Sequence, residues 1–419
     1  MRNLKPLVWL SAIVLIVALV IVTACTPKTT EPTGKTDTPE ATSTAFELYT
    51  GTLPTPNDKG VITADQWKDI YPDIYESFMM NEQNTVNPSY LDQYDFLAVI
   101  YDGTGFGKSY NEARGHPFTL QDVANTGRPH ALANCLTCKS PEFTALVVKD
   151  GVGVYSREFD EVYALLDQSI SCYNCHANTN GDLVVSADFL NNALGADKAS
   201  LDPVDIACGQ CHNEYYFDPE TKATTLPWSG VSKMNPDDML AYYNDINFTD
   251  FVNNVSGANM IKIQHPEMET ILGAGSKVPS MTPNNCADCH MGTATNSDGK
   301  EYPSHYLLSP LKNPALIDST CKSCHQDLAA EVAAIQKDTK DRLVVIGNKL
   351  ADLHKKIGAA ADAGKTDEEL AGARQSVRDA QFYYDFVFVE NSDGAHNSAL
   401  TKHCLDQAEQ IADAALAAL

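Results

Sequence analysis

Five pairs of cysteines share one spacing in this sequence, with two residues between the members of each pair. In four pairs a histidine directly follows the second cysteine. These four are Cys172–Cys175–His176, Cys208–Cys211–His212, Cys286–Cys289–His290 and Cys321–Cys324–His325. The pattern is the attachment signature of c-type haem, in which both thiols bond to the vinyl groups and the histidine binds the iron. It therefore predicts four covalent haem sites.

The fifth pair differs in the residue that follows it. Cys135 and Cys138 precede Lys139 instead of a histidine. A neutral lysine can bind iron if burial and the iron depress its pKa; the alternative is a surface lysine beside a haem whose ligand comes from elsewhere. An iron held by Lys139 on one face keeps the opposite face free, whereas an iron between two histidines has no open position. The sequence thus predicts four electron-carrying haems and one that does chemistry.

Zinc sites and disulfides are the alternatives for these cysteines. Zinc sites combine two cysteine or histidine pairs and do not need a histidine directly after each second cysteine. Disulfide frameworks belong to short chains, whereas this one has 419 residues. The five pairs use ten of the twelve cysteines, which leaves Cys25 and Cys404. The simplest interpretation of Cys404 is a buried thiol.

Residues 1–24 have the pattern of a lipoprotein signal peptide. Arg2 and Lys5 give a charged start, an apolar run follows, and Cys25 ends a segment that looks like a lipoprotein signal-peptidase site. The alternative is an uncleaved membrane anchor, because the run is nearly long enough to span a bilayer. Either way we expect an exported body, at the outer face of the cytoplasmic membrane or in the periplasm. Residues 25–45 are rich in threonine and proline and predict a tether.

The formal net charge of −25 argues against nucleic acid and against an anionic membrane surface as partners. An anionic substrate would have to be attracted locally, by a cationic pocket.

The rest of the chain changes character at about residue 325. Residues 46–325 are short segments separated by Gly, Pro and Asn, which favours a domain organised by haem packing rather than by a sheet. Residues 96–101 are the best candidate for a strand. A helix is predicted to start after Thr63 and to run through Tyr71 and Tyr75.

Residues 326–419 have a helical pattern. Two apolar stripes recur at three and four residues, namely Leu343, Ile346, Leu350, Leu353, Ile357 and then Leu370, Ala373, Val377, Ala380, Tyr384, Val387. A break is expected at 358–365, before a capping box of Thr366 and Glu369. The pattern predicts a long antiparallel hairpin that packs on the haem domain or, because the stripe is long, forms a dimer interface. A last helix is predicted at about 398–419.

The chain resembles the pentahaem ammonia-forming cytochrome c nitrite reductases of the cytochrome c552 family, from about residue 60 to its end. Four segments carry the resemblance, namely Ala113–His116, Cys135–Lys139, Cys208–Phe217 and Lys262–Pro266. It implies a mainly α multihaem cytochrome c fold with few short strands, a homodimer through long C-terminal helices, and six-electron reduction of nitrite to ammonium. With the N-terminal pattern, it suggests a lipid-anchored enzyme supplied by a membrane quinol-oxidising multihaem cytochrome.

Arg114, Tyr215 and His265 match the catalytic residues of that family. Arg114 suits a fixed cation that holds nitrite oxygens. His265 suits a hydrogen-bond donor and proton source, because the unperturbed pKa of histidine lies near working pH. Tyr215 could donate a hydrogen bond or take part in radical or proton steps. His116 either serves the proton route or is structural.

The resemblance also implies calcium beside five covalently bound haems c. Glu214 and Gln264 match the family's calcium side-chain ligands, and the backbone carbonyls of Tyr215 and Lys262 complete the set. Such oxygens are hard ligands suited to calcium. The cation would order the loops that carry Tyr215 and His265 and add positive potential for an anion.

Four bis-histidine haems need four further histidines. With haems numbered in chain order, His305 matches the family's second ligand of haem 2, and His396 that of haem 4. For haem 3 the nearest matching position is Tyr94, and His130 is another candidate. For haem 5 the matching stretch holds no histidine.

Three residues remain as candidates for haem 5, namely Met268, Lys277 and Met281. His354 and His403 are expected to face solvent on the C-terminal helices.

Two other functions stay open. A pentahaem electron-transfer conduit would explain the missing histidines, but it would not need Arg114, Lys139, Tyr215 or His265. The same site could also reduce hydroxylamine or sulfite.

Overall fold

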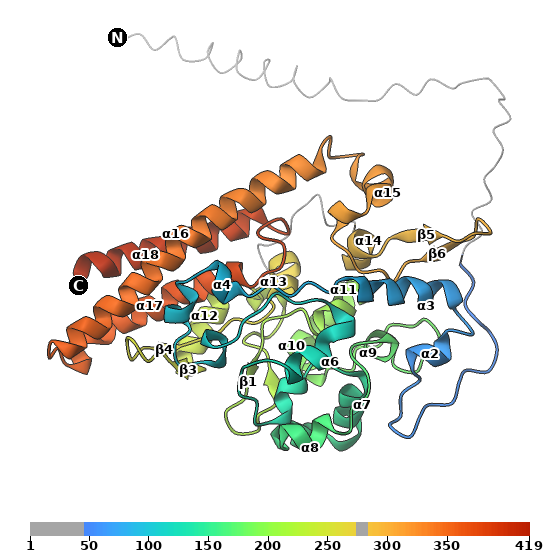
Figure 1. Ribbon diagram of the computed structural model, residues 1–419, viewed down its shortest axis with the longest axis horizontal. Coiled ribbons are helices and arrows are strands. Elements are labelled where there is room, and N and C mark those ends of the chain that lie inside the picture. The colour runs from blue at the N-terminus through green and yellow to red at the C-terminus, as the bar shows by residue number, and fades with distance from the viewer. Residues whose placement is uncertain (1–45, 274–283) are drawn as a thin grey trace, which may run out of the picture. The chain divides into compact units, whose positions relative to one another are not determined.

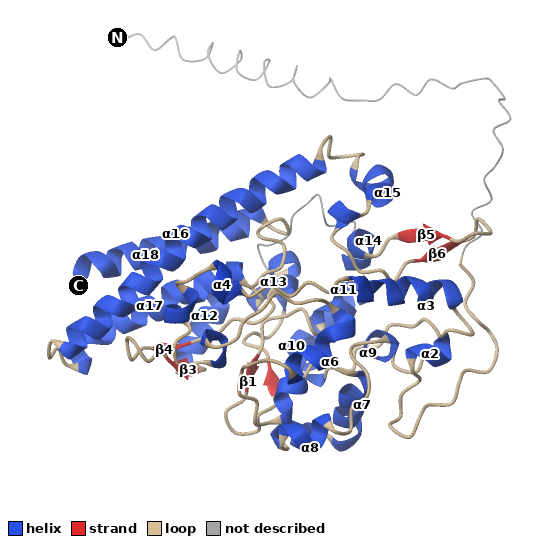
Figure 2. Cartoon of the chain, viewed as in Figure 1, coloured by secondary structure: helices blue, strands red, loops and turns tan. Residues whose placement is uncertain are grey.

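The computed structural model describes residues 46–273 and 284–419, and this part of the chain is mainly helical (Figure 1, Figure 2). The expectations of a signal peptide, of a lipidated Cys25 and of a tether concern residues outside it, as do the candidates Lys277 and Met281. No helix within these two ranges is long and apolar enough to cross a membrane.

Short helices joined by loops precede the C-terminal region. They are α2 (Ala64–Trp67), α3 (Pro72–Met79), α4 (Tyr90–Gln93), α5 (Leu97–Ile100), α6 (Thr119–Ala124), α7 (Pro141–Asp150), α8 (Phe159–Tyr163), α9 (Cys172–His176), α10 (Asp188–Leu194), α11 (Pro203–Gly209), α12 (Pro236–Asp245), α13 (Glu267–Leu272), α14 (Cys286–His290) and α15 (Pro314–Leu316). Three antiparallel hairpins pair β1 (Tyr216–Phe217) with β2 (Thr224–Thr225), β3 (Phe251–Val252) with β4 (Asn259–Met260), and β5 (Thr293–Thr295) with β6 (Glu301–Pro303). The predicted mainly α class with few short strands is confirmed.

A capping box begins the first of these helices, as expected at Thr63. Its hydroxyl accepts a hydrogen bond from the Gln66 N–H, and the Gln66 side chain accepts one from the Thr63 N–H. The single helix predicted through Tyr75 is wrong, because α2 and α3 are separate. Tyr71 precedes Pro72, and a proline disfavours helical backbone angles in the residue before it. Tyr71 accordingly has φ −128° and ψ 65°, which lie outside the helical region.

The strand predicted at residues 96–101 is also wrong, because α5 occupies this place. Leu97 and Ile100 are both fully buried and lie three residues apart, which puts them on one side of a single helical turn. Helix α5 packs against the C-terminal helix α16 (Leu328–Asp362). A short apolar run fits the periodicity of a strand as well as that of a helix. Packing against the rest of the fold therefore determines which of the two forms.

Three long helices end the chain and pack along one another at the left of Figure 1. After α16 come α17 (Asp367–Phe388) and α18 (Ser398–Ala418). The predicted capping box is present, with the Thr366 hydroxyl accepting from the Glu369 N–H and the Glu369 carboxylate accepting from the Thr366 N–H. The predicted hairpin and last helix are thus confirmed.

The apolar stripe of α16 packs inside the chain. Leu350, Leu353 and Ile357 are 0% exposed, so these residues cannot form the predicted dimer interface. Gly358 continues the helix instead of breaking it. A Cβ there would lie 2.3 Å from the carbonyl oxygen of Val255, so the close approach of a loop requires glycine at this position.

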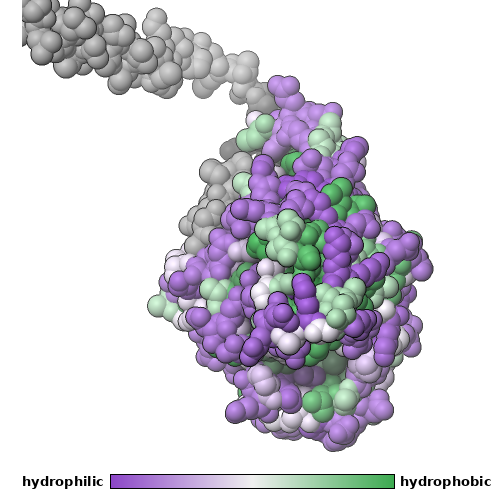
Figure 3. All heavy atoms as spheres, turned by 90° about the vertical axis from the view of Figure 1, so that its left-hand side faces the viewer, coloured by the Kyte–Doolittle hydropathy of each residue, from purple (hydrophilic) through white to green (hydrophobic). Residues whose placement is uncertain are grey.

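The surface at this end of the C-terminal helices carries both apolar and hydrophilic residues. Figure 3 shows apolar areas among hydrophilic ones on this face. Val344 and Val345 of α16 are 39% and 51% exposed. A partner contact of α16 would have to use such outward residues rather than the buried stripe.

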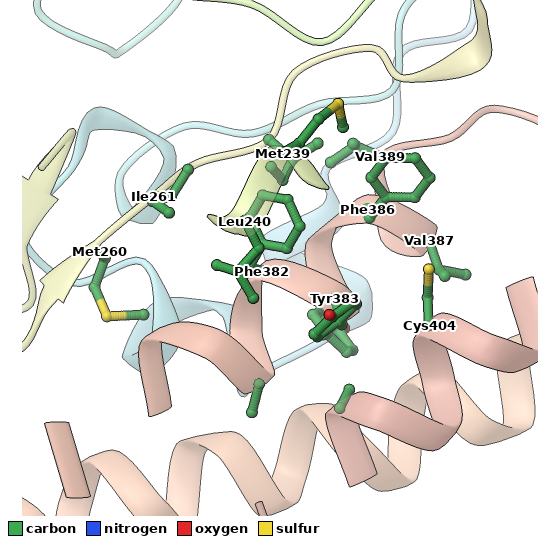
Figure 4. Packing of buried hydrophobic residues seen from close by; sticks show 14 of the residues in the cluster. Met239, Leu240, Met260, Ile261, Phe382, Tyr383, Phe386, Val387, Val389 and Cys404 are labelled. Carbon is green, nitrogen blue, oxygen red and sulfur yellow. The ribbon is translucent and has the colours of Figure 1, made fainter. Parts of the chain in front are cut away.

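The largest core joins α17 to the haem-bearing body. Figure 4 shows Phe382 and Phe386 of α17 beside Met239 and Leu240 of α12, in one buried cluster. Cys404 of α18 belongs to the same cluster and is fully buried, which confirms the interpretation of a buried thiol.

His354 is buried, which contradicts the expectation that it faces solvent. Its Nδ1 lies 2.8 Å from the Ser256 hydroxyl and its Nε2 lies 3.0 Å from the Gln381 side-chain oxygen, so both ring nitrogens have partners. His403 is partly exposed, and its Nε2 lies 3.0 Å from an Asp237 carboxylate oxygen. The helical stripe could not reveal His354 because Ser256 lies in a distant loop.

We expect Leu350→Ala to lower the free energy of unfolding by about 2–5 kcal/mol, because it leaves a cavity among α5, α16 and α17. Val345→Ala on the same helix is the control and should stay within about 0.5 kcal/mol of the parent. Chemical denaturation of the haem-loaded protein measures both. Equal effects would show that the stripe does not stabilise the fold.

Candidate active site

All ten paired cysteines are free thiols. In residues 46–273 and 284–419, no group of three or more His, Cys, Asp or Glu side chains could hold a metal ion. The pairs therefore retain the thiols that covalent haem attachment consumes.

Residues between the cysteines cap the short helices that carry them. In α9 the Asn174 side chain accepts a hydrogen bond from the Ser171 N–H at 3.0 Å. In α14 the Asp288 carboxylate accepts one from the Asn285 N–H at 2.9 Å. Positions three apart on a helix lie on one side, so both thiols of a pair face the same way.

Three pairs of imidazole rings face each other across the interior. Their centroid distances are 6.2 Å for His176 and His305, 5.9 Å for His290 and His396, and 6.3 Å for His116 and His212. The His265 ring also lies near His212, with centroids 6.5 Å apart. A metal–nitrogen bond is about 2 Å and a ring centroid lies about 1 Å behind its nitrogen, so two histidines on one iron have centroids roughly 6 Å apart. The residues present therefore fit haem iron at these three places.

His116 is the residue that sequence reasoning missed as a partner of His212. The expected alternatives are engaged elsewhere. Tyr94 packs on the Phe96 and Phe388 rings, and the His130 ring lies 3.9 Å from that of Phe159. His116 and His130 are the two histidines between residue 46 and the first cysteine pair. The sequence therefore offered only these two histidines upstream as partners of His212, and His116 could have been considered.

In two of these pairs, His176 with His305 and His290 with His396, a hydrogen bond holds Nδ1 of each ring, so Nε2 is the nitrogen that can bind a metal. The partners are Asp182 O for His176 at 3.1 Å, Pro303 O for His305 at 3.2 Å, Leu308 O for His290 at 2.8 Å, and a Glu390 carboxylate oxygen for His396 at 2.6 Å. Such hydrogen bonds fix the tautomer and the orientation of a ligand histidine.

Thiols of different pairs touch, so the attachment sites are neighbours. The Cys138 and Cys211 thiols interact closely enough that each shifts the pKa of the other, and so do the Cys208 and Cys286 thiols. The first, third and fourth sites thus follow one another in space. A cavity of about 410 Å³ opens beside Cys138 and Cys211.

Met268 lies at the third pair rather than the fifth. Its N–H donates to the carbonyl oxygen of His212 at 3.0 Å, and its sulfur packs against Gly209. This placement argues against Met268 as a ligand of haem 5.

Thr119 ties the segment of Arg114 to the lysine site. Its hydroxyl lies 3.0 Å from the carbonyl oxygen of His116 and 2.9 Å from that of Lys139. The Arg114 guanidinium forms an ion pair with Asp122 and stacks 4.2 Å from the Phe118 ring. Arg114 is therefore held rigidly by its own segment and α6, not by Tyr215 or His265.

His265 and Tyr215 are both neutral donors in this environment. Burial, together with the smaller effects of nearby Lys139 and His212, lowers the pKa of His265 to about 4 against the opposing charge of Glu267. The imidazole is therefore uncharged at neutral pH, unlike the expected proton source with an unperturbed pKa. Burial raises the pKa of Tyr215, so its hydroxyl keeps its proton.

The expected calcium ligands lie together in the interior. Glu214 is fully buried, and its carboxylate accepts hydrogen bonds from the Gln264 N–H at 2.6 Å and the Tyr243 hydroxyl at 2.8 Å. The Gln264 side chain donates to the carbonyl oxygen of Lys262 at 2.9 Å. Buried Glu269 accepts from the Glu214 N–H but has one carboxylate oxygen without a partner. This concentration of buried oxygens fits a hard cation.

The Lys262 side chain has a role that the sequence did not indicate. It is buried, donates to the carbonyl oxygen of Ile263 at 2.6 Å, and lies 5.0–5.4 Å from the ring centres of Tyr101, Phe106 and Tyr110. Aromatic faces attract a cation at this distance, so the ammonium anchors the segment that leads to His265.

A helical fold with repeated cysteine pairs and facing histidines defines a multihaem c-type cytochrome, which carries covalently bound haem c. The model of the family Cytochrome c552 matches residues 63–419, and the chain belongs to this family.

The solved structure of cytochrome c nitrite reductase (NrfA) from Desulfovibrio desulfuricans ATCC 27774 is similar, with 27% identity and a TM-score of 0.74. The match covers 85% of this chain and 86% of that one, whose catalytic subunit has two calcium sites. Outer cell wall cytochrome OcwA is 22% identical at a TM-score of 0.40, with 71% and 48% coverage. An undecahaem cytochrome from the S-layer of Carboxydothermus ferrireducens is 18% identical at 0.36, with 74% and 42% coverage. The last two carry no argument here.

We expect His116→Met to raise the reduction potential of one low-spin haem by on the order of 100 mV, because a thioether replaces an imidazole on the iron. Redox titration followed by electron paramagnetic resonance (EPR) measures the shift. His403→Met, at a partly exposed position, is the control and should leave all haems unchanged. An unaltered haem spectrum in His116→Met would rule out His116 as a ligand.

Proposed function

We propose that this protein is an exported, lipid-anchored nitrite reductase that forms ammonium at haem 1, attached to Cys135 and Cys138. Nitrite takes up six electrons and eight protons and yields ammonium and two waters. The observation that carries the proposal is Lys139 in the place of the histidine that follows the other four cysteine pairs, in a chain whose fold is similar to that of a solved nitrite reductase. When bound, the five haems supply electrons, and haem 1 supplies an iron with an open position.

Lys139 would hold the iron of haem 1 in the place that histidine takes at the other four sites, and that haem would supply a position for substrate. Arg114 attracts the anion with a guanidinium fixed by Asp122 and Phe118. The ion pair partly offsets the positive charge of Arg114 but restricts the motion of its side chain. Arg114 would therefore orient nitrite more than it attracts it.

His265 and Tyr215 donate hydrogen bonds to the substrate oxygens from their neutral forms. Because the pKa of His265 lies near 4, its N–H donates without adding a positive charge. The protons that the leaving oxygens take up to form water come from solvent, while these two donors orient the oxygens. Their neutrality keeps product ammonium from meeting a second cation on the way out.

Electrons reach haem 1 through the neighbouring sites. We propose His176 and His305 as ligands of haem 2, His290 and His396 of haem 4, and His116 and His212 of haem 3. Haem 5 would take His325 as its histidine ligand. The thiol contacts make haems 1, 3 and 4 successive stations.

Calcium, a homodimer and a membrane donor complete the proposal. Glu214, Gln264 and the carbonyls of Tyr215 and Lys262 would hold calcium, which would order the loops of Tyr215 and His265. The dimer would form through outward residues of the C-terminal helices. A quinol-oxidising multihaem cytochrome would deliver electrons.

We expect the haem-loaded protein to oxidise reduced viologen with nitrite and to release ammonium. Lys139→His should keep five haems by mass but lower turnover at least about 100-fold, because histidine would replace lysine on the iron that is proposed to bind nitrite. Lys149→His, exposed on α7, is the control and should match the parent.

Absence of ammonium from the loaded parent would contradict the enzyme and favour the electron conduit. Faster turnover with hydroxylamine or sulfite than with nitrite would instead change the substrate. Equal turnover in Lys139→His would remove the special role of this lysine.

We expect a chelator to lower nitrite turnover and added calcium to restore it. Glu214→Gln keeps the shape but removes the anionic ligand, so calcium affinity should fall at least about tenfold. Calcium titration calorimetry measures this, with exposed Glu220→Gln as control. Parental affinity in Glu214→Gln would place the ion elsewhere.

A further inference from the structure

In the pairs His176–His305 and His290–His396, one histidine is held by a buried carboxylate, whereas the other three are held by backbone carbonyls. Glu390 follows α17 and is 4% exposed. One of its carboxylate oxygens lies 2.6 Å from Nδ1 of His396. In the described residues, His396 is also the one ion-pair partner of Glu390.

The segment after α17 is built to hold this carboxylate in place. The second oxygen of Glu390 accepts hydrogen bonds from the Ser392 hydroxyl at 2.5 Å and the Ser392 N–H at 3.3 Å. The His396 N–H in turn donates to the Ser392 hydroxyl at 2.9 Å. Gly394 turns the chain with φ +92°, a conformation that favours glycine. The carboxylate and the imidazole are therefore oriented by one short loop.

The other carboxylates near ligand histidines are weaker partners. Glu331 lies 2.7 Å from Nδ1 of His325, but its side chain is 49% exposed, so solvent screens its charge. Glu267 lies 3.7 Å from Nδ1 of His212, beyond hydrogen-bond distance. Glu390 combines burial with a short contact.

A carboxylate changes the iron through the ring. It carries a full negative charge where a backbone carbonyl carries a partial one, and its hydrogen bond to a charged partner is the stronger. It draws the Nδ1 proton and makes Nε2 a more basic ligand. A more basic ligand favours ferric iron, so one-electron reduction becomes less favourable while the shared proton stays between Glu390 and His396.

We propose that Glu390 is a positioning residue that tunes haem 4, lowering its reduction potential relative to haem 2. The inference rests on the proposed ligands of haem 4, His290 and His396. Haem 2, whose histidines have carbonyl partners at Asp182 and Pro303, is its internal reference. Because the thiol contact of Cys208 and Cys286 places haem 4 beside haem 3, a low potential there passes electrons toward haem 1 instead of storing them.

The test is a redox titration of the haem-loaded protein, followed optically and by EPR, with Glu390→Gln. The glutamine still accepts the Nδ1 hydrogen bond but carries no charge. At a fixed applied potential, the ferrous-to-ferric ratio of haem 4 should rise about tenfold, which is about 59 mV for one electron. Haem 2 should not move. His396→Met identifies which component belongs to haem 4.

Ser392→Ala is a second variant with the opposite expected sign. Removing the hydroxyl leaves the carboxylate charge less stabilised and more attractive to the Nδ1 proton, so the potential of haem 4 should fall. This variant keeps the inference testable even if Glu390→Gln fails to load haem. Glu409→Gln on α18, in a surface ion pair with Arg342 and Lys349, is the control.

An unchanged haem 4 in Glu390→Gln, with its low-spin signal intact, would overturn the inference. A His396→Met protein with five unaltered haems would overturn it together with the proposed ligands. A shift of haem 4 in a protein that forms no ammonium from nitrite would support the tuning and contradict the enzyme.

Discussion

The separation of paired imidazole rings, about 6 Å in three places, is the constraint on which this structure depends. Each pair joins segments distant in sequence, such as α9 with the loop of His305. The space between two such rings would hold an iron, so it cannot be filled by packed side chains. An extended sheet would place its backbone where the haem must lie. Short capped helices and loops satisfy the requirement because they place a ring and, for His176, His305 and His396, fix its Nδ1 through a residue two to six positions away.

The C-terminal helices supply the rigidity that such loops lack. Their apolar stripe is buried within the chain, and α17 packs on α12 and the β4 hairpin. Buried Asp385 of α17 accepts a hydrogen bond from Tyr101 at 2.6 Å, and Tyr101 is one of the rings around Lys262. Helix α17 is thus connected to the loop of Gln264 and His265 through the contacts of Asp385 with Tyr101 and of Tyr101 with Lys262.

Local patterns in the sequence predicted what local physics determines. The cysteine spacing, the helix start after Thr63 and the capping box of Thr366 depend on neighbouring residues, and the helix start and the box are present as expected. The helix α5, the partner of His116 and the burial of His354 depend on contacts from remote segments. The stripe of α16 was recognised, but one chain's sequence cannot tell an internal apolar face from an interface between chains.

Charge remains the hardest requirement of the proposed reaction, since 55 acidic and 30 basic side chains oppose an anionic substrate. Arg114 is already paired with Asp122, and the neutral form of His265 adds no charge. Lys262 is buried among aromatic rings, where its field is screened little, but burial also lowers its pKa. A calcium ion on Glu214 would add two positive charges beside it. In this chain the proposed cation is therefore an electrostatic part of the site as well as a brace for its loops.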